Sequence, residues 1–261
     1  MLNSRAVAPE SFNQITNDLR SIARRAGDAI MAIATSSMTV ERKADQSPVT
    51  AADTAANDLI VTALSELTPD IPVVSEEGAQ VLSEPDQPFW LVDPLDGTKE
   101  FIAGNGEFTV NIALIEQRKP THGVIYAPAT DRMFFSSGPG QAFQQFGTAP
   151  PTHLKARIAK PGSLVALASR SHLDERTKKF LSQCHVTNIK QMGSSLKLCL
   201  IAAGEADIYP RFGPTMEWDT AAGHAILTAA GGSLTTPDGQ PLQYAKPDLR
   251  NPDFVARGAA G

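Results

Sequence analysis

The chain of 261 residues is poor in cysteine and contains only Cys184 and Cys199. So few thiols suit a reducing compartment. Cys199 lies in an apolar stretch with helical periodicity, where a small buried thiol is the expected role. Neither cysteine lies in a sequence motif typical of a nucleophilic thiol paired with a histidine. The sequence therefore argues against a catalytic cysteine.

Basic blocks and long apolar runs are also lacking. The net charge is −5 and the pI is about 5.5, which argues against nucleic acid as a partner. Residues 1–13 show no basic segment followed by an apolar one, and the apolar run at 29–34 is far too short to span a membrane. We therefore expect a cytoplasmic protein with no transmembrane segment. Peripheral association with the cytoplasmic face of the inner membrane stays open.

Apolar residues, by contrast, are plentiful. They make up 42% of the chain, enough for one large domain or for two packed halves. We expect a flexible extension at 1–13, an N-terminal α/β half at 14–150 and a C-terminal α/β half at 151–261. The alternation of helical and strand patterns predicts α/β layering, although periodicity alone does not give the order of the layers.

Hydrophobic periodicity predicts the individual elements. Helices are expected at 11–34, 53–67, 174–183, 194–203 and 218–230. Strands are expected at 72–75, 89–92, 108–116, 122–127, 132–136, 142–146, 164–169, 186–191, 206–209 and 233–236. The segment 108–116 is almost continuously apolar, which is typical of a central strand covered on both faces.

The most informative segment is Trp-Leu-Val-Asp-Pro-Leu-Asp-Gly-Thr-Lys-Glu-Phe at 90–101. Asp93 and Asp96 directly follow an apolar run, so we expect both carboxylates where a buried strand breaks into a turn. Pro94 and Gly97 favour a sharp and rigid bend. Two hard oxygen ligands on a rigid turn suit Mg²⁺. The alternative is a turn in which an aspartate side chain caps its own backbone.

Two further acidic sites lie at the ends of predicted elements. Glu76 and Glu77 follow a short β-branched run, and Asp219 falls in the first turn of a predicted helix, near the positive end of its dipole. Each has a simpler interpretation, since the glutamates could lie in a solvated loop and Asp219 could be a helix N-cap. The same pattern, a carboxylate beside a small residue at the end of a helix or strand, occurs three times along the chain. This repetition favours a single site to which all three segments contribute.

Together these motifs resemble those of a known superfamily. Three motifs follow one another along the chain: Glu76-Glu77, Asp-Pro-Leu-Asp-Gly-Thr at 93–98, and the distal Trp218-Asp219. In this order they resemble the motifs of the lithium-sensitive, Mg²⁺-dependent sugar phosphatases. This superfamily includes inositol monophosphatases, fructose bisphosphatases and 3′(2′),5′-bisphosphate nucleotidases. The resemblance extends from about Lys43 to the C-terminal region, and the combination of motifs is highly specific.

Other residues distinguish groups within the superfamily. Inositol monophosphatases usually follow Asp-Gly-Thr with Thr-Asn-Phe, whereas Lys-Glu-Phe at 99–101 is similar to the bisphosphate nucleotidases of the bacterial CysQ type. Further segments resemble the signature or the nucleotide-contacting regions of that group: 43–53, 169–172, 193–197 and 209–215.

The resemblance implies a fold, a metal centre and catalytic residues. The fold would be an α-β-α-β-α sandwich with the active site between two sheet-containing halves. Two or three Mg²⁺ ions would be bound by Glu76, Asp93, the carbonyl oxygen of Leu95, Asp96 and Asp219. Asp53 and Thr98 would orient or deprotonate the attacking water, with Glu76 also counted as catalytic. Glu77 would support the metal ligands without binding the metal itself, and a direct role in catalysis is the alternative.

Substrate contacts are also implied by the resemblance. The backbone N–H groups of Gly97 and Thr98 would bind phosphate oxygens, and Asp219 would also contact the substrate. Candidates for the second phosphate and the base are Lys43, Arg170, His172, Ser194, Lys197 and Arg211. Ordinary surface charges, or a helix cap at Ser194, remain the alternatives.

The function that the resemblance implies is hydrolysis of adenosine 3′,5′-bisphosphate to AMP and phosphate, in sulphur assimilation and nucleotide recycling, with lithium sensitivity. Two metal ions about 3.5–4 Å apart can clamp the attacking and leaving oxygens of such a reaction. The alternative activity is an inositol or sugar phosphate monoesterase, and a non-catalytic metal or nucleotide sensor is disfavoured. Action on the 3′-phosphorylated sulphate donor and the oligomeric state stay open.

Overall fold

A computed structural model of the chain describes residues 13–34, 40–42, 48–78, 86–160, 162–170, 173–186 and 188–261. The expected N-terminal extension lies outside the described residues except for Asn13. Two predicted substrate contacts, Lys43 and His172, also lie outside them.

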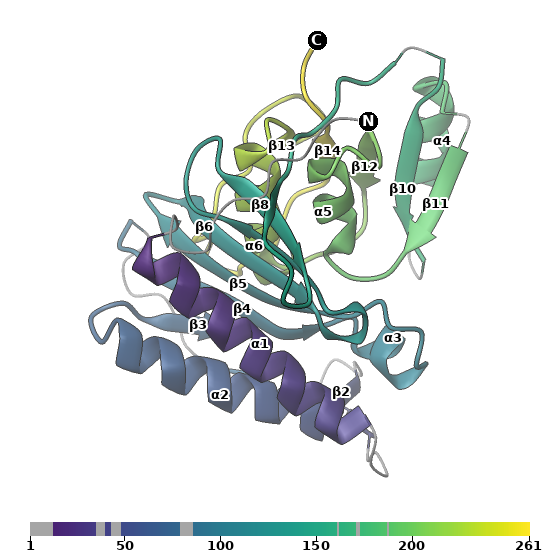
Figure 1. The fold of residues 1–261 in the computed structure, drawn as a ribbon. Coiled ribbons are helices and arrows are strands. Elements are labelled where there is room, and N and C mark those ends of the chain that lie inside the picture. Colours follow the sequence, from purple (N-terminus) through teal and green to yellow (C-terminus); the bar gives the residue numbers. More distant parts are fainter. Residues whose placement is uncertain are drawn as a thin grey trace.

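The molecule is built in five layers (Figure 1). Helices α1 (Gln14–Ala34) and α2 (Ala51–Leu67) cover one face of a seven-stranded sheet. Helices α5 (Leu196–Ala202) and α6 (Glu217–Ala229) lie between this sheet and a five-stranded sheet, which α4 (Glu175–Gln183) covers on its outer side. The predicted α-β-α-β-α order is confirmed.

Each sheet comes from one part of the chain. The larger sheet has the order β3 (Val73–Ser75), β4 (Phe89–Asp96), β5 (Thr109–Glu116), β6 (Lys119–Ala127), β7 (Arg132–Ser136), β8 (Ala142–Phe146), β9 (Thr152–His153). It is antiparallel except for the β3–β4 pair. The smaller sheet has the order β11 (Asn188–Met192), β10 (Val165–Ser169), β12 (Ile208–Arg211), β14 (Phe254–Arg257), β13 (Ser233–Thr235).

Shorter elements complete the described chain. Strands β1 (Val40–Arg42) and β2 (Pro48–Thr50) pair with each other, and β2 leads directly into α2. Helix α3 (Thr98–Ile102) follows β4, and a 3₁₀ turn, η2 (Pro128–Thr130), joins β6 to β7. Among the described residues, the structure contains no helix that is both long enough and apolar enough to span a membrane.

Apolar residues on both faces of the larger sheet form two cores. Helix α1 buries Leu19, Ile22, Ala26 and Ile30 along one stripe, as its helical period requires, and this stripe packs with α2 against one face of the sheet. The second core joins the opposite face to α5, α6 and the smaller sheet. Because this second core draws on both sheets, it fixes one half of the chain against the other.

Small residues let α6 approach the larger sheet closely. A Cβ atom on Gly123, in β6, would lie only 2.4 Å from the carbonyl oxygen of Ala222 in α6. Only glycine therefore allows this contact between the strand and the helix backbone. The close packing holds the start of α6, where Asp219 lies, next to the sheet that carries Asp93 and Asp96.

The structure departs from the predicted elements in a few places. The strand expected to end at Val92 continues to Asp96, and the strand expected at 206–209 is instead Ile208–Arg211. Six short elements of the described chain were not predicted: β1, β2, α3, η2, β9 and β14. All are five residues or shorter, so they carry little periodic signal of their own, and β14 depends on pairing with strands distant in sequence.

Candidate active site and metal-binding residues

A bulge in β4 brings the two central aspartates to the same face of the sheet. Asp93 pairs with Asn111 of β5, and Asp96 pairs with Thr109, so three steps along β4 match two along β5. Residues three apart in a regular strand point to opposite faces, and one extra residue restores the common face. The expectation that the strand breaks before both carboxylates is therefore wrong, because the strand passes through them with an irregularity between.

The turn after the bulge places Thr98 beside Asp53. Gly97 has φ of +90°, and a Cβ atom there would lie 3.0 Å from the carbonyl oxygen of Glu107, so glycine is required. Helix α3 begins at the next residue, and Thr98 Oγ1 donates a hydrogen bond to Asp53 Oδ1 over 3.1 Å. The two residues are 45 positions apart in sequence.

Asp53 is held from its other side by the start of α2. Its Oδ2 accepts hydrogen bonds from the backbone N and from Oγ1 of Thr50, both over 2.7 Å. Thr50 is the N-cap of α2 and Asp53 is the third helical residue, so Asp53 is not itself the cap residue. This arrangement leaves Asp53 Oδ1 for Thr98.

Asp93 and Asp219 share one feature: the local backbone holds one carboxylate oxygen. Asp93 Oδ1 accepts from the backbone N of Leu95 over 3.1 Å, and Asp219 Oδ2 accepts from the backbone N of Met216 over 2.8 Å. Met216 is the N-cap of α6, so Asp219 is not itself the cap residue. The described residues donate no hydrogen bond to the second oxygen of either aspartate, which leaves one oxygen of each for a ligand.

Asp96 is held by residues that are distant in sequence. Its Oδ2 accepts from the backbone N of Ser195 over 2.6 Å and from Asn111 Nδ2 over 3.4 Å. None of the described residues donates a hydrogen bond to Oδ1. The three aspartates thus follow the same pattern, in which one oxygen is fixed and the other is available.

The carboxylates repel one another in this environment. Asp93 is 2% exposed, and burial, followed by the negative charge of Glu76 and of neighbouring aspartates, raises its pKa well above the usual range. Burial and the charge of Asp96 likewise raise the pKa of Asp219 well above that range. The charges of Lys197 and Arg211 offset this only in part, because the pKa values of Asp96 and Asp219 stay raised, and a bound cation would supply the remaining positive charge.

The donor set fits a hard divalent cation. Within the described ranges, no three His, Cys, Asp or Glu side chains approach closely enough to form a ready-made metal cluster. Glu76, Asp96 and Asp219 instead line a cavity, and every candidate ligand atom is an oxygen, including the carbonyl oxygen of the buried Leu95. Oxygen-only donors on rigid backbone suit Mg²⁺ in preference to softer metals.

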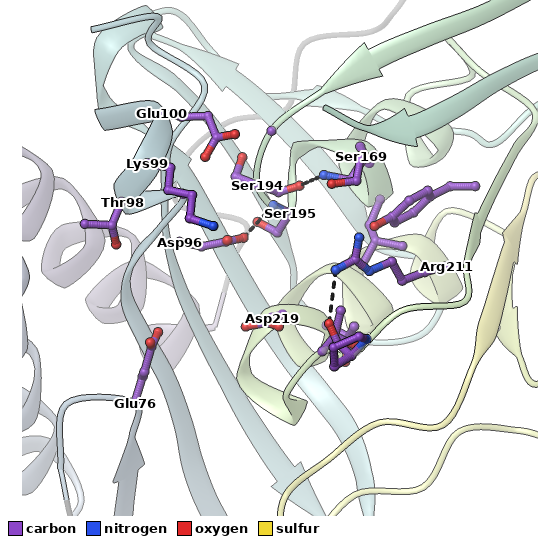
Figure 2. A pocket seen from close by; sticks show the side chains of 18 of the residues that line it. Glu76, Asp96, Thr98, Lys99, Glu100, Ser169, Ser194, Ser195, Arg211 and Asp219 are labelled. Carbon is purple, nitrogen blue, oxygen red and sulfur yellow. Dashed lines mark hydrogen bonds between the residues drawn. The ribbon is translucent and has the colours of Figure 1, made fainter. Parts of the chain in front are cut away.

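Three of the candidate ligands line a cavity of about 390 Å³ between the two halves (Figure 2). Glu76, which follows β3, contributes to its wall together with Asp96 and Asp219. Other predicted site residues also line it: Gly97, Thr98, Ser194, Lys197 and Arg211. Lys99 and Glu100 line the cavity as well. In the sequence, these two residues indicated the bisphosphate nucleotidases within the superfamily.

Two buried cations lie on the C-terminal side of this cavity. Lys197 is 5% exposed, its Nζ donates to the carbonyl oxygens of Ser194 and Met192, and burial lowers its pKa to about 8. Arg211 is 6% exposed, and its Nη2 donates to the carbonyl oxygen of Pro214 over 3.0 Å. Arg211 Nε and Nη1 are buried without an acceptor among the described residues, so this guanidinium can still bind an anion.

Arg170 and Glu77 are placed differently from the other candidates. Arg170 is exposed and pairs with Glu107 over 2.6 Å, and it does not line the cavity. Glu77 lies in the turn after β3, next to Glu76, and does not line the cavity either. Both remain hypotheses as functional residues.

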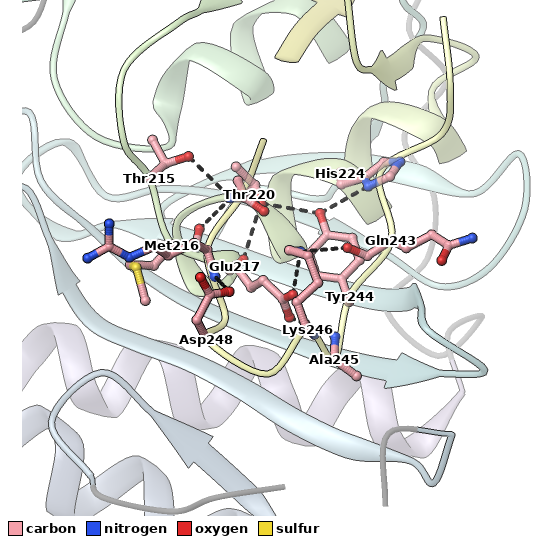
Figure 3. A network of polar contacts seen from close by, with 12 residues as sticks. Thr215, Met216, Glu217, Thr220, His224, Gln243, Tyr244, Ala245, Lys246 and Asp248 are labelled. Atoms are coloured by element: carbon pink, nitrogen blue, oxygen red, sulfur yellow. Dashed lines mark hydrogen bonds and ion pairs between the residues drawn. The ribbon is translucent and has the colours of Figure 1, made fainter. Parts of the chain in front are cut away.

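A buried polar network supports the first turn of α6 (Figure 3). Glu217 is fully buried, pairs with Lys246, and accepts hydrogen bonds from the backbone N atoms of Ala245 and Lys246 over 2.8 and 3.0 Å. Asn251 Nδ2 donates to the carbonyl oxygen of Met216 over 2.6 Å. These contacts fix the turn that presents Asp219.

The sequence interpretation missed several supporting residues. Asn111 had one usable signal, because it is a polar residue in the middle of an almost continuously apolar strand. Thr50 and Glu107 gave no comparable signal, since polar residues before a helix or in a loop are common. Ser195 was predicted only as part of the segment 193–197, which resembles a nucleotide-contacting region and could equally cap the following helix. It does occupy the N-cap position of α5, but its hydroxyl bonds to Asn111 instead of to the helix.

Comparison with known proteins agrees with this geometry. The model of the inositol monophosphatase family matches residues 12–258. The 3′(2′),5′-bisphosphate nucleotidase CysQ of Escherichia coli (strain K12) is 50% identical over 239 residues, which cover 89% of this chain and 95% of the relative. The protein of the same name from Salmonella typhimurium is 49% identical over 238 residues, with the same two coverages.

A solved structure shows the same architecture along its whole length. The crystal structure of CysQ from Bacteroides thetaiotaomicron, described as a bacterial member of the inositol monophosphatase family, is 38% identical with a TM-score of 0.83. The match covers 97% of this chain and 100% of that one. From the layered fold, the acidic cavity and these matches, we conclude that the chain belongs to the inositol monophosphatase family.

Proposed function

We propose that this protein is a Mg²⁺-dependent 3′(2′),5′-bisphosphate nucleotidase that converts adenosine 3′,5′-bisphosphate to AMP and phosphate. The high identity to curated nucleotidases over most of the chain supports the activity. The family is generally metal-dependent, and the oxygen-only donor set supports Mg²⁺ as the ion.

One observation supports the proposed substrate. The cavity has carboxylates for cations on one side and, on the other, a buried arginine with two nitrogen atoms that lack acceptors. Bound cations would neutralise the reacting phosphate, while a second phosphate would meet the guanidinium, which matches phosphate oxygens well. A substrate with two separated phosphates uses both ends of the cavity.

The hydrogen bonds around Thr98 support a role in orienting the attacking water. The Thr98 hydroxyl is directed at two acceptors, Asp53 Oδ1 at 3.1 Å and the carbonyl oxygen of Leu95 at 3.3 Å. Because it is the donor in both contacts, its lone pairs are available to accept a hydrogen bond from a water molecule. Asp53 is the stronger base of the two and can take up the proton that the water loses, through the threonine hydroxyl. Thr50 holds Asp53 in place for this role.

The metal ligands in this proposal are Glu76, Asp93, the Leu95 carbonyl, Asp96 and Asp219. When bound, divalent cations supply positive charge to the phosphoryl oxygens and make the attacking water more acidic. The protein's own contribution is to fix each aspartate by one oxygen, so that the other is presented without side-chain rotation.

The same geometry argues against two alternative functions. An inositol or sugar phosphate monoesterase would need the carboxylate side of the cavity but would leave the buried Arg211 without a partner. A non-catalytic sensor would have no use for a hydroxyl bonded to a held carboxylate, and the Thr98–Asp53 pair therefore disfavours it.

The activity is tested by comparing substrates in one assay with Mg²⁺. We expect adenosine 3′,5′-bisphosphate to be hydrolysed with a much higher kcat/KM than inositol 1-phosphate, and both activities to stop when a chelator removes the metal. A preference for inositol 1-phosphate would overturn the proposed substrate and favour the monoesterase.

Arg211 provides the test of how the substrate is chosen. Arg211→Ala should lower kcat/KM for adenosine 3′,5′-bisphosphate about 10- to 100-fold more than for a sugar monophosphate, which corresponds to roughly 1.5–3 kcal/mol. Arg211→Lys, which keeps the charge but not the fork of donors, should lie between. Equal losses on both substrates would show that Arg211 supports the fold or the common site instead.

A further inference from the structure

A buried chain of hydrogen bonds ends on Asp96. Ser195 Oγ donates to Asn111 Oδ1 over 2.8 Å and lies 2.9 Å from Thr109 Oγ1. Because Ser195 has a single hydroxyl proton, Thr109 must be the donor in their contact. Asn111 then donates from Nδ2 to Asp96 Oδ2. The bonds therefore run in one direction, from Thr109 through Ser195 and Asn111 to the carboxylate.

These polar residues are almost inaccessible to solvent. Thr109, Asn111 and Ser195 are 0%, 1% and 5% exposed. Burying polar groups in this way is costly unless each one finds a partner. Each does so here, and the last acceptor is a predicted metal ligand.

The turn that carries Ser195 is itself anchored. The backbone N of Gly193 donates to Glu107 Oε2 over 2.7 Å, and Lys197 Nζ donates to the carbonyl oxygen of Ser194. Ser194 has φ of +47°, in the left-handed region that non-glycine residues rarely adopt. The anchors keep this turn in place, so the backbone N–H of Ser195 stays directed at Asp96 Oδ2.

Asp96 differs in this respect from the other two aspartates. Asp93 and Asp219 are fixed by backbone groups two or three residues away, whereas Asp96 is fixed from β5 and from the start of α5, 99 residues away. Its orientation therefore depends on how the two halves of the chain pack together.

We propose that Asn111 and Ser195 are positioning residues that hold Asp96 by Oδ2 so that Oδ1 binds a divalent cation. The packing of the 193–195 turn on the larger sheet thereby sets part of the metal affinity. This inference rests on the proposed function, in which Asp96 is a metal ligand.

The test measures Mg²⁺ binding without substrate, by isothermal titration calorimetry. Asn111→Leu removes the donor to Asp96 with little change of shape, and we expect at least a tenfold loss of Mg²⁺ affinity, as for other groups that orient metal ligands. The matched control is Thr109→Val, which removes a hydrogen bond from the same buried cluster, because the Thr109 side chain contacts Ser195 and makes no hydrogen bond to the Asp96 carboxylate. Its Mg²⁺ affinity should stay within about twofold of the wild type.

Steady-state kinetics add a second readout. For Asn111→Leu, the Mg²⁺ concentration that gives half-maximal activity should rise, and kcat should recover at saturating Mg²⁺. A general loss of structure would not be rescued in this way. If Asn111→Leu does not fold, as judged by its thermal unfolding, Asn111→Ser serves instead, because its shorter hydroxyl cannot span the distance to Asp96.

Asp96→Asn separates failure of the inference from failure of the proposed function. If Asp96→Asn loses Mg²⁺ affinity while Asn111→Leu behaves like Thr109→Val, the positioning role is overturned and the metal site stands. If Asp96→Asn binds Mg²⁺ as the wild type does, Asp96 is not a ligand. The metal assignment within the proposed function then fails together with the inference.

Discussion

Asp93 shows how one residue can serve function at the expense of stability. It is buried opposite Asn111, and its pKa is raised because burial and neighbouring carboxylates disfavour its charge. In the unfolded chain an aspartate has a pKa of about 3.9. Without metal, the stability from this group is therefore fully present below about pH 4 and is lost as the pH rises through the raised folded-state pKa.

This imbalance leads to a prediction for Asp93→Asn. The variant should lose activity by about a thousandfold, roughly 4 kcal/mol of barrier, because the negative charge of a proposed metal ligand is removed. In the absence of Mg²⁺ it should nevertheless unfold at a higher temperature than the wild type, and the difference should grow as the pH rises above about 4. Thermal scans at several pH values, with and without Mg²⁺, provide the measurement. Near-normal turnover at saturating Mg²⁺ would contradict the ligand role.

Thr98 is the second residue whose role can be isolated. Thr98→Ala removes the hydroxyl that bonds to Asp53 but leaves the candidate metal ligands in place. We expect kcat to fall about 100- to 1000-fold, with Mg²⁺ affinity changed by less than about twofold. Thr98→Ser keeps the hydroxyl and should retain most of the activity. If Mg²⁺ affinity changes more than kcat does, Thr98 belongs to the metal site instead.

At the scale of single elements, the start of α6 is the most heavily supported part of the site. Glu217 is fully buried, and its partner Lys246 has a side chain that is 23% exposed. Removing one partner of a buried ion pair leaves an uncompensated charge, which costs about 3–5 kcal/mol when both groups are deeply buried. The partial exposure of Lys246 reduces this cost.

We therefore expect Lys246→Met to lower the free energy of unfolding by about 1–3 kcal/mol. Lys178→Met is the matched control, because Lys178 pairs with Glu175 on α4 where both side chains are largely exposed, and it should cost less than about 0.5 kcal/mol. Denaturant unfolding measures both. Equal and small effects would show that the Glu217 network does not stabilise the turn that presents Asp219.

At the scale of the whole molecule, the halves share a core. The larger sheet is complete by His153, yet one of its faces is covered by α5 and α6 from the second half. A chain that ends at Lys160 would therefore expose an apolar sheet face to water. We expect such a fragment to lack cooperative thermal unfolding and to bind a hydrophobic dye. Cooperative unfolding of the isolated fragment would contradict the view that the halves depend on each other.

Much of the fold and part of the candidate site could be predicted from the sequence alone. Periodicity placed all the long helices and most strands, because burial on one face or on two leaves a regular apolar pattern. The acidic motifs around Asp93, Asp96 and Asp219 were recognisable because the chemistry of a metal site demands particular residue types at short spacings. The structure brings the last two of these residues to one cavity with Thr98 and Arg211.

Other features were decided only by the tertiary structure. The bulge that turns Asp93 and Asp96 to one face is a matter of register with β5, which is set by long-range hydrogen bonds. The contacts of Asn111 and Ser195 with Asp96 join parts of the chain that meet only when the two halves pack. The pairing of Arg170 with Glu107 likewise depends on this packing. Local sequence records the preference of each residue for its near neighbours, but it does not specify which distant group completes its hydrogen bonds.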